Sequence, residues 1–274
     1  MIAAVTVLHD SRAHLERLLD SIDVHGRGQV HVVAVDTGSR DGGAELAAAR
    51  GCTVVDRPDN PGFGPANNAG LERVPPEAEV TALLNPDVEL LDDGLLTLAE
   101  RARTAPPGTL LFPRLLNPDG SVQDTAHPRP GSWSEIARAF LPARLAPQPY
   151  RATGTRPIGW AIAAAVVART DTLRALGPFD PHAFMFYEDL DLSLRAARCE
   201  LHPDVALRHI GGHSTGAERL PLEATRRREV VAERLGEPAR RRDDLAQALT
   251  FARAGVRSPR AREQLRALRV ARRA

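Results

Sequence analysis

The chain has 274 residues, 43% hydrophobic and 26% charged, a composition typical of a folded globular protein that excludes a disordered or fibrous chain. Its longest run without a charged residue has 12 residues, too few for a membrane-spanning helix of about 20, and its two cysteines are too few for a disulfide framework. The formal net charge is only +1, and because the sequence contains no lysine, mechanisms that need a lysine Schiff base or a phosphate-loop lysine are excluded.

Short apolar runs alternate with helical patterns over the first ninety residues. This alternation predicts an α/β fold with a mostly parallel sheet covered by helices on both faces. The apolar start lacks the basic flank and cleavage site of a secretory signal, so we expect the protein to stay in the cytoplasm. The strands are predicted at Ala3–Leu8, Val30–Val35, Thr53–Asp56 and Val80–Leu84, and the helices at Ser11–Asp23, about Asp41–Arg50 and about Pro65–Arg73.

The middle of the chain, residues 104–158, is rich in proline and glycine. It is expected to be irregular, with a hairpin turn at Asn117–Gly120 and a short helix at Ser132–Leu145. This stretch is either a loop beside a binding site, on the side where a second substrate would enter, or simply a long connection between elements. After it, strands are predicted at Gly159–Ala168 and Leu201–His209, and helices at Asp171–Leu176 and Asp189–Cys199.

The last part of the chain is helical in pattern and basic. Residues 217–274 contain 16 arginines and 8 acidic residues, with helix breaks near Gly236–Pro238 and Gly255–Pro259. We therefore expect a main domain at 1–216 and a helical extension at 217–274. The extension either lies on an anionic membrane surface or packs on the core or on a second subunit as a homodimer contact. Nucleic acid is not expected as a partner, because no aromatic stacking platform accompanies the charge.

Polar clusters follow three of the predicted strands, at Asp36, Asn60–Asn68 and Asn85–Asp87. Because ligands bind beyond the carboxyl ends of parallel strands, these clusters are expected to meet in one cleft. Asp36 precedes a glycine-rich turn, where a carboxylate either binds a nucleobase or ribose or simply caps the turn. Asp87 follows a proline-stiffened turn, where it is either a ligand of a divalent cation that also binds substrate phosphates or an ordinary turn residue.

Aromatic residues stand directly before the acids Glu188, Asp189 and Asp191. Acids are favoured at a helix N-terminus for structural reasons alone. Apolar walls around a carboxylate also favour its neutral form, which tunes a general base toward working pH. His209 and His213 follow the last predicted strand, and although a lone histidine is more often structural, two near a cation site are candidate ligands.

Taken in order, five stretches resemble the motifs of the inverting family 2 glycosyltransferases, most closely their rhamnosyltransferase-like branch. The resemblance spans about residues 1–216 and implies the GT-A fold, a Rossmann-like, mixed and mostly parallel sheet flanked by helices. The matching stretches are Val33–Gly42, Asn60–Leu71, Leu83–Leu90, Gly177–Arg195 and His209–Thr215.

The resemblance also implies the substrates and the roles of individual residues. It implies a nucleoside diphosphate sugar donor, best matched by dTDP-L-rhamnose, a saccharide, lipid-linked or small-molecule acceptor, and Mg²⁺ or Mn²⁺. Asp189 would be the general base with Glu188 beside it, and Asp87 and His209 would bind the metal, with His213 as the substitute for His209. The donor would be bound by Asp36, Gly38, Ser39, Asp41, Asn60, Gly62, Asn68, Asn85, Asp87, Gly159 and Trp160.

Two other functions are compatible with the same core. A sugar-nucleotide pyrophosphorylase usually carries a glycine-rich, lysine-containing signature near its N-terminus, and Leu8–Arg12 is not one. A catalytically silent module that binds a nucleotide sugar or a carbohydrate would have no use for three converging acids. The sequence therefore favours an enzyme, a glycosyltransferase.

Overall fold

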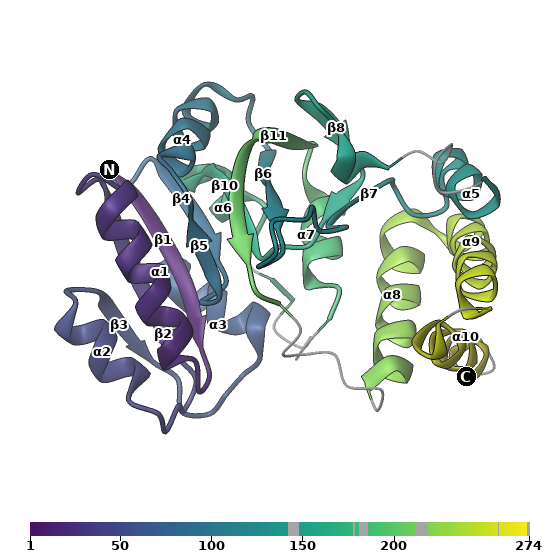
Figure 1. Cartoon of the computed structure of the whole chain (residues 1–274), viewed down its shortest axis with the longest axis horizontal. Coiled ribbons are helices and arrows are strands. Elements are labelled where there is room, and N and C mark those ends of the chain that lie inside the picture. The colour runs from purple at the N-terminus through teal and green to yellow at the C-terminus, as the bar shows by residue number, and fades with distance from the viewer. Residues whose placement is uncertain (142–147, 178, 181–185, 212–218, 257, 273–274) are drawn as a thin grey trace.

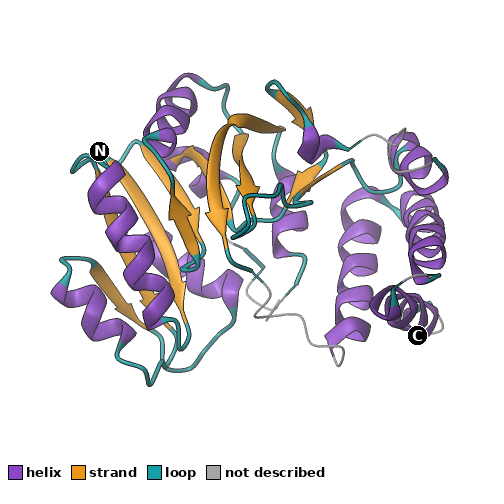
Figure 2. Cartoon of the chain, viewed as in Figure 1, coloured by secondary structure: helices purple, strands orange, loops and turns teal. Residues whose placement is uncertain are grey.

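The computed structural model describes the chain apart from residues 142–147, 178, 181–185, 212–218, 257 and 273–274. Figure 1 shows a twisted central sheet with helices on both faces, and a group of C-terminal helices beside it. Figure 2 shows that strands lie only in the sheet-containing part and not among these C-terminal helices.

One half of the sheet is parallel, as predicted. The strand order is β3 (Thr53–Asp56), β2 (Val30–Asp36), β1 (Ile2–Leu8) and β4 (Val80–Leu84). Strands β1 and β4 are buried along nearly their whole length, which explains their continuous apolar sequences. The connecting helices are α1 (Arg12–His25), α2 (Gly43–Ala49) and α3 (Phe63–Glu72).

The other half of the sheet is mixed. It continues from β4 through β10 (Ala165–Arg169), β6 (Thr109–Leu116), β11 (Arg198–His209) and β5 (Val88–Leu90). Strand β10 is antiparallel to β4 and β6, β11 is parallel to β6, and β5 is antiparallel to β11. Strand β8 (Arg156–Ile158) also pairs with β11, and β7 (Ala126–His127) forms a separate pair with β9 (Trp160–Ala161). The predicted mixed, mostly parallel sheet flanked by helices is confirmed.

Neither the helix α4 (Gly94–Thr104) nor the strand β6 was predicted from the sequence. Strand β6 crosses a stretch expected to be irregular, yet it lies inside the sheet between β10 and β11. Pro113 lies within β6, and the pairing with β11 shifts register there, between His202 and Ala206. The irregularity of the strand pair therefore accommodates the proline. The predicted turn at Asn117–Gly120 is confirmed, since the Asn117 N–H donates to the Ser121 carbonyl at 2.8 Å.

Several predicted elements differ in extent. The predicted helix Ser132–Leu145 ends at Phe140, and positions 142–145 of it lie outside the described residues, while the predicted strand Leu201–His209 begins earlier, at Arg198. The predicted strand Gly159–Ala168 is divided into β9 and β10. The predicted helix Asp189–Cys199 is α7 (Glu188–Arg195), which ends because Ala196 takes an extended backbone, so Cys199 belongs to β11. The remaining helices are α4 (Gly94–Thr104), α5 (Trp133–Phe140), α6 (Thr170–Ala175), α8 (Leu220–Leu235), α9 (Glu237–Gly255) and α10 (Pro259–Ala271), with a 3-10 turn at Pro149–Arg151.

The C-terminal helices break where predicted and pack against the rest of the chain. Gly236, at φ 82°, separates α8 from α9. A hydrophobic cluster joins Trp160 of β9 and Leu190 of α7 to α8 and α9. The described residues of the extension thus pack on the core, which is one of the arrangements considered for it. The domain boundary at 216 stays a prediction. None of the described helices has the length and apolar content that crossing a membrane requires.

Candidate active site

Asp36 ends β2 and is held in a defined orientation by the turn that follows. Its Oδ2 accepts hydrogen bonds from the Gly38 and Ser39 N–H groups, both at 3.2 Å. Gly38 has φ 80°, a backbone conformation that disfavours other residues. The Asp36 side chain is buried, and its Oδ1 has no partner among the described residues. One oxygen therefore shapes the turn, and the other is available to a ligand that donates a hydrogen bond.

Asp41 and Ser39 cross-link the two loops beside Asp36. The Asp41 carboxylate accepts from the Arg12 N–H at 2.6 Å and from the Gly43 N–H at 3.0 Å. The Ser39 hydroxyl accepts from the Asp10 N–H at 3.1 Å. These bonds fix the loops after β1 and β2 relative to one another, next to Asp36.

The glycine- and asparagine-rich segment leads into α3. Asn60 and Gly62 have positive φ angles of 41° and 96°, and Gly62 is the N-cap of α3. The Asn68 amide bonds the main chain of Phe179 twice, donating to its carbonyl at 2.9 Å and accepting from its N–H at 2.8 Å. Asn68 thus ties α3 to the segment that leads into α7, while the nucleotide contact predicted for it stays a prediction.

Asp87 and His209 face one another across β5 and β11. The His209 Nε2 lies 3.4 Å from the Asp87 Oδ1, and the Asp87 Oδ2 accepts from the Gly211 N–H at 2.8 Å. Burial raises the pKa of Asp87, but the hydrogen bond and charge of His209, with the Gly211 N–H, outweigh burial and hold it below its ordinary value. The pair therefore favours an ionised carboxylate.

Gln123, which the sequence analysis missed, fixes the orientation of His209. Its Nε2 donates to the His209 carbonyl at 2.7 Å, and its Oε1 lies 2.9 Å from the His209 Nδ1. The Nδ1–H therefore donates to Gln123, so a protonated ring also donates from Nε2 to Asp87, whereas a neutral ring presents an Nε2 lone pair beside the Asp87 carboxylate. With the ring neutral, this nitrogen and the Asp87 Oδ1, 3.4 Å apart, are two electron-pair donors that fit a shared cation.

The donor set for that cation is small. Among the described residues, no group of three or more histidine, cysteine or acidic side chains is arranged to hold a metal ion. A carboxylate with an imidazole nevertheless suits Mg²⁺ or Mn²⁺, which take further ligands from water and substrate phosphates. Asn85 adds a buried Oδ1 for which the described part of the chain supplies no partner. His213, the predicted substitute ligand, lies outside the described residues.

Glu188 and Asp189 open α7, where burial makes them weak acids. The Asp189 carboxylate accepts from the Leu190 N–H at 2.7 Å and from the Ala163 N–H at 3.4 Å. Burial raises the pKa of Asp189 to about 6. Burial, followed by the charge of Asp189, raises the pKa of Glu188 to about 8. Asp189 is therefore the stronger candidate for a base that is ionised near neutral pH.

The segment between β9 and β10 connects this base to the cluster after β4. Ala163 donates its N–H to Asp189, and the next residue, Ala164, accepts a hydrogen bond from the Asn85 N–H at 2.8 Å. Asp189 and Asn85 are thus bonded to neighbouring residues of one short segment. The acids at positions 87 and 189, about a hundred residues apart in sequence, are brought to the same region of the fold.

Trp160 lies beside the aromatic residue that precedes these acids. Its ring centroid is 6.1 Å from that of Tyr187 and 4.4 Å from that of His127, and its buried Nε1 lacks a partner within the described chain. Gly159 has a packing role, since a Cβ atom there would lie 2.0 Å from the main-chain nitrogen of Arg129. The rest of the aromatic stretch, residues 181–185, lies outside the described residues.

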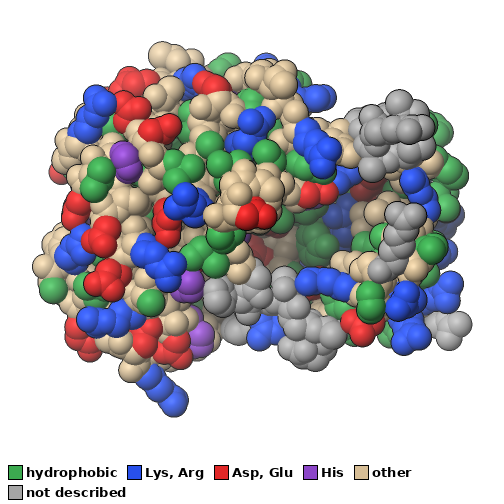
Figure 3. Space-filling model, viewed as in Figure 1, with side chains coloured by type: hydrophobic (Ala, Val, Ile, Leu, Met, Phe, Trp, Pro, Cys, Tyr) green, Lys and Arg blue, Asp and Glu red, His purple; other side chains and the backbone are tan. Residues whose placement is uncertain are grey.

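The surface is hollowed between the sheet-containing part and the C-terminal helices, and hydrophobic and acidic side chains are visible inside the hollow (Figure 3). Its entrance provides room for a ligand to approach from solvent. The described residues supply an available carboxylate oxygen at Asp36, a candidate cation site at Asp87 and His209, and a weakly acidic carboxyl group at Asp189. These parts suit the displacement of a diphosphate leaving group by a hydroxyl.

Comparisons with known proteins agree with this chemistry. The sequence profile described as Glycosyl transferase family 2 matches residues 4–160. An N-acetylglucosaminyl-diphospho-decaprenol L-rhamnosyltransferase of Mycobacterium tuberculosis is 29% identical over 241 residues, 80% of this chain and 78% of the relative. The mannosyltransferase PcManGT from Pyrobaculum calidifontis, in complex with GDP-Man and Mn²⁺, superposes with a TM-score of 0.61 at 14% identity, covering 98% of this chain and 80% of the other. S. aureus TarS 1-349 in complex with UDP-GlcNAc has a TM-score of 0.54 at 15% identity, covering 99% and 90%.

Proposed function

The chain belongs to glycosyl transferase family 2 and has the GT-A fold, and from this premise we propose that it transfers L-rhamnose from dTDP-L-rhamnose to a saccharide hydroxyl. The curated relative supports this choice of donor, because it is an L-rhamnosyltransferase aligned over most of both chains. That relative acts on N-acetylglucosaminyl-diphospho-decaprenol. We therefore propose a saccharide on a lipid-linked diphosphate as the acceptor here.

The nucleoside end of the donor is assigned to the turn after β2. The free Asp36 Oδ1 is an acceptor for the N–H of a thymine ring or for a ribose hydroxyl. The Gly38 N–H and the Ser39 N–H hold the other oxygen, so the carboxylate does not have to be ordered when the ligand binds. The cross-linked loops at Asp41 preserve the shape of this pocket.

The diphosphate end is assigned to Asp87 and His209. These two residues would hold Mg²⁺ or Mn²⁺, which when bound would neutralise negative charge on the departing diphosphate. Gln123 keeps the His209 Nε2 free for that purpose through its contact with Nδ1 at 2.9 Å. Asn85, with its unpartnered Oδ1, is placed to bind the donor beside this pair.

Asp189 acts as the general base. Its carboxylate takes the proton of the acceptor hydroxyl as that oxygen attacks the anomeric carbon of the sugar. The bond from the anomeric carbon to the diphosphate oxygen breaks in the same step, and dTDP leaves with its electron pair. Attack from the face opposite the leaving group inverts the anomeric configuration, and no covalent enzyme intermediate is needed.

The observation that supports this proposal best is the short segment Ala163–Ala164, which bonds Asp189 on one side and the Asn85 main chain on the other. It brings the candidate base to the cluster that would face the diphosphate. A base and a leaving-group site on opposite sides of one sugar are what an inverting displacement requires.

Turnover with a panel of donors tests the proposal. The protein is incubated with dTDP-L-rhamnose, UDP-GlcNAc or GDP-mannose, Mg²⁺ or Mn²⁺, and a lipid-linked N-acetylglucosaminyl diphosphate. We expect dTDP to be released. The mass of the acceptor should increase by that of one deoxyhexose residue, which mass spectrometry detects. Turnover with another donor alone would correct the choice of sugar, whereas failure to bind or turn over any nucleotide sugar would refute the proposal.

A lipid-linked acceptor also calls for a surface that meets the membrane. Two aromatic side chains of α5 support such a role, because Trp133 is 81% exposed, Phe140 is 61% exposed, and both lie on the same face of the helix, about two turns apart. The arginine-rich helix α9 packs beside α5. Association with vesicles that contain acidic lipids is expected, and Trp133→Ala with Phe140→Ala should abolish it. Flotation of the variant together with the vesicles would argue against this surface.

A further inference from the structure

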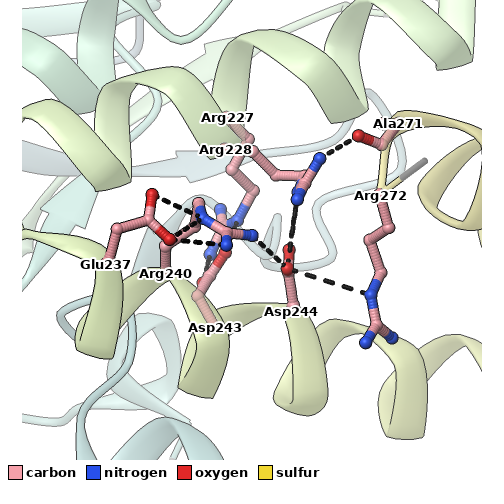
Figure 4. A network of polar contacts seen from close by, with 8 residues as sticks. All are labelled: Arg227, Arg228, Glu237, Arg240, Asp243, Asp244, Ala271 and Arg272. Atoms are coloured by element: carbon pink, nitrogen blue, oxygen red, sulfur yellow. Dashed lines mark hydrogen bonds and ion pairs between the residues drawn. The ribbon is translucent and has the colours of Figure 1, made fainter. Parts of the chain in front are cut away.

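Two neighbouring arginines of α8 form equivalent ion pairs with two neighbouring aspartates of α9 (Figure 4). Arg227 bonds Asp243 through two nitrogens, Nε at 2.9 Å and a terminal nitrogen at 2.6 Å. Arg228 bonds Asp244 through Nε at 3.0 Å. The two pairs have the same chemistry and the same sequence separation, so they form a natural comparison.

The pair of Arg228 and Asp244 connects the C-terminal helices to one another. Arg228 also donates to the Ala271 carbonyl at the end of α10, and Asp244 accepts from Arg240 on its own helix at 2.7 Å. The Arg272 side chain approaches Asp244 as well, at 4.0 Å. All of these contacts stay within α8, α9, α10 and the residue that caps α10, as Figure 4 shows.

Arg227 points instead toward the active site. Its side chain is buried, and a terminal nitrogen bonds the Glu135 carboxylate of α5 at 3.0 Å. The central guanidinium carbon lies 5.6 Å from the ring centroid of Trp160 and 5.6 Å from that of Tyr187. A cation at this distance from two aromatic rings attracts both, and the attraction is strongest where water is excluded.

Tyr187 is the N-cap residue of the helix that carries Asp189. Phe186 and Tyr187 have left-handed backbone angles, φ 76° and φ 60°, which cost about 1–3 kcal/mol each and persist only where surrounding contacts enforce them. The Tyr187 carbonyl accepts from the Asp191 N–H at 2.9 Å and so begins the first turn of α7. The position of Asp189 therefore depends on how firmly Tyr187 is held.

We propose that Arg227 is a positioning residue for the transfer reaction, which fixes Trp160 and Tyr187 and through Tyr187 the general base Asp189. The proposal rests on the proposed function for its catalytic consequence. Stability alone does not require a buried ionic cluster, because apolar side chains of similar volume often serve as well. The cluster with Asp243 and Glu135 fixes the direction of the guanidinium, and this direction determines where the two rings lie.

The test compares Arg227→Met with Arg228→Met, each in a Trp133→Phe background that leaves Trp160 as the single tryptophan. Both variants lose a partly or fully buried ion pair of α8 with α9. Displacement of a catalytic group by about 1 Å can cost about 100-fold in rate, so we expect Arg227→Met to lower kcat by about 10- to 100-fold with little change in the donor KM. Arg228→Met should stay within about threefold of the parent, since it leaves Asp189 in place.

Trp160 fluorescence gives a readout that does not depend on turnover. Acrylamide quenching should increase in Arg227→Met and stay unchanged in Arg228→Met. Arg227→Lys and Asp243→Asn replace Arg227→Met if the methionine variant does not fold, and both should show the same two effects to a smaller degree. Equal kcat and equal quenching in the Arg227 and Arg228 variants would overturn the positioning role. A parent that transfers no sugar would refute the proposed function, while the quenching comparison would still decide the packing claim.

Discussion

Replacing Asp189 by asparagine is predicted to abolish transfer and at the same time to stabilise the protein. The asparagine side chain can still accept from the Leu190 and Ala163 N–H groups, but it cannot take a proton from the acceptor hydroxyl. Loss of a general base commonly lowers the rate by about 10²- to 10⁴-fold. Nucleotide affinity should be unchanged, because Asp36 and Asp87 are untouched.

The stability effect follows from the pKa of Asp189. Burial raises this pKa from an ordinary 3.8 to about 6, so ionising the carboxyl group in the folded protein costs free energy. A pKa shift of about two corresponds to at most about 3 kcal/mol of free energy. We expect Asp189→Asn to raise the free energy of unfolding by about 1–3 kcal/mol, because the substitution also loses the stronger hydrogen bonds that an ionised carboxylate accepts.

The sign of the pH dependence is fixed by the same shift. Well below the ordinary pKa of 3.8 the carboxyl group is neutral in both the folded and the unfolded chain, and the substitution should bring no gain. The penalty of the charge grows as pH rises from about 4 and is fully present above the folded pKa of about 6. The gain at pH 5 should be about half of the gain at pH 8.

Urea unfolding of the parent and of Asp189→Asn at pH 5 and pH 8 measures this difference, and Asp191→Asn is the matched control on the same helix. Asp191 is ion-paired with Arg195 at 2.9 Å and with Arg234 at 2.6 Å, so its substitution should destabilise the protein. A loss of stability in Asp189→Asn at pH 8, or a gain that does not change with pH, would refute the reasoning.

Three further outcomes are expected. The rate of transfer should rise with pH through about 6 as Asp189 loses its proton, and a kcat profile that is flat from pH 5 to 8 would contradict this. Asp36→Ala should weaken dTDP binding by about 10- to 100-fold in calorimetry, since a buried hydrogen bond to a charged group contributes about 1.5–3 kcal/mol, and unchanged affinity would remove the nucleoside assignment. Gln123→Ala should weaken Mn²⁺ binding by about 10- to 100-fold, measured by titration in the presence of dTDP, because His209 loses the contact that orients it, whereas an equal affinity would show that Gln123 is dispensable.

The parallel half of the fold was predictable because its signals are local. Strands β3 and β4 have the predicted limits, since each is a short apolar run bounded by turn residues. Strand β6 was missed because the prolines and glycines around it outweighed its apolar run, while pairing on both edges stabilises it in the structure. Tertiary contacts, which sequence patterns do not report, decided this element.

The candidate site shows the same limit. The motifs around Asp36, Asp87 and Asp189 were visible in the sequence because each follows or begins a regular element. Gln123 and Arg227 carry no such signal, because each contacts a residue far away in the sequence. His209 lies 86 residues from Gln123, and Glu135 lies 92 residues from Arg227. Asn68 was assigned to the nucleotide from its motif, and only the structure places Phe179 against its amide.

A crystal structure of the protein with dTDP-L-rhamnose and Mn²⁺ is the most direct test of the account. The account predicts the thymine or ribose on the Asp36 carboxylate, the diphosphate and the cation beside Asp87 and His209, and the anomeric carbon facing Asp189 from the side opposite the diphosphate. A nucleotide bound elsewhere, or a sugar that Asp189 cannot reach from that side, would contradict it.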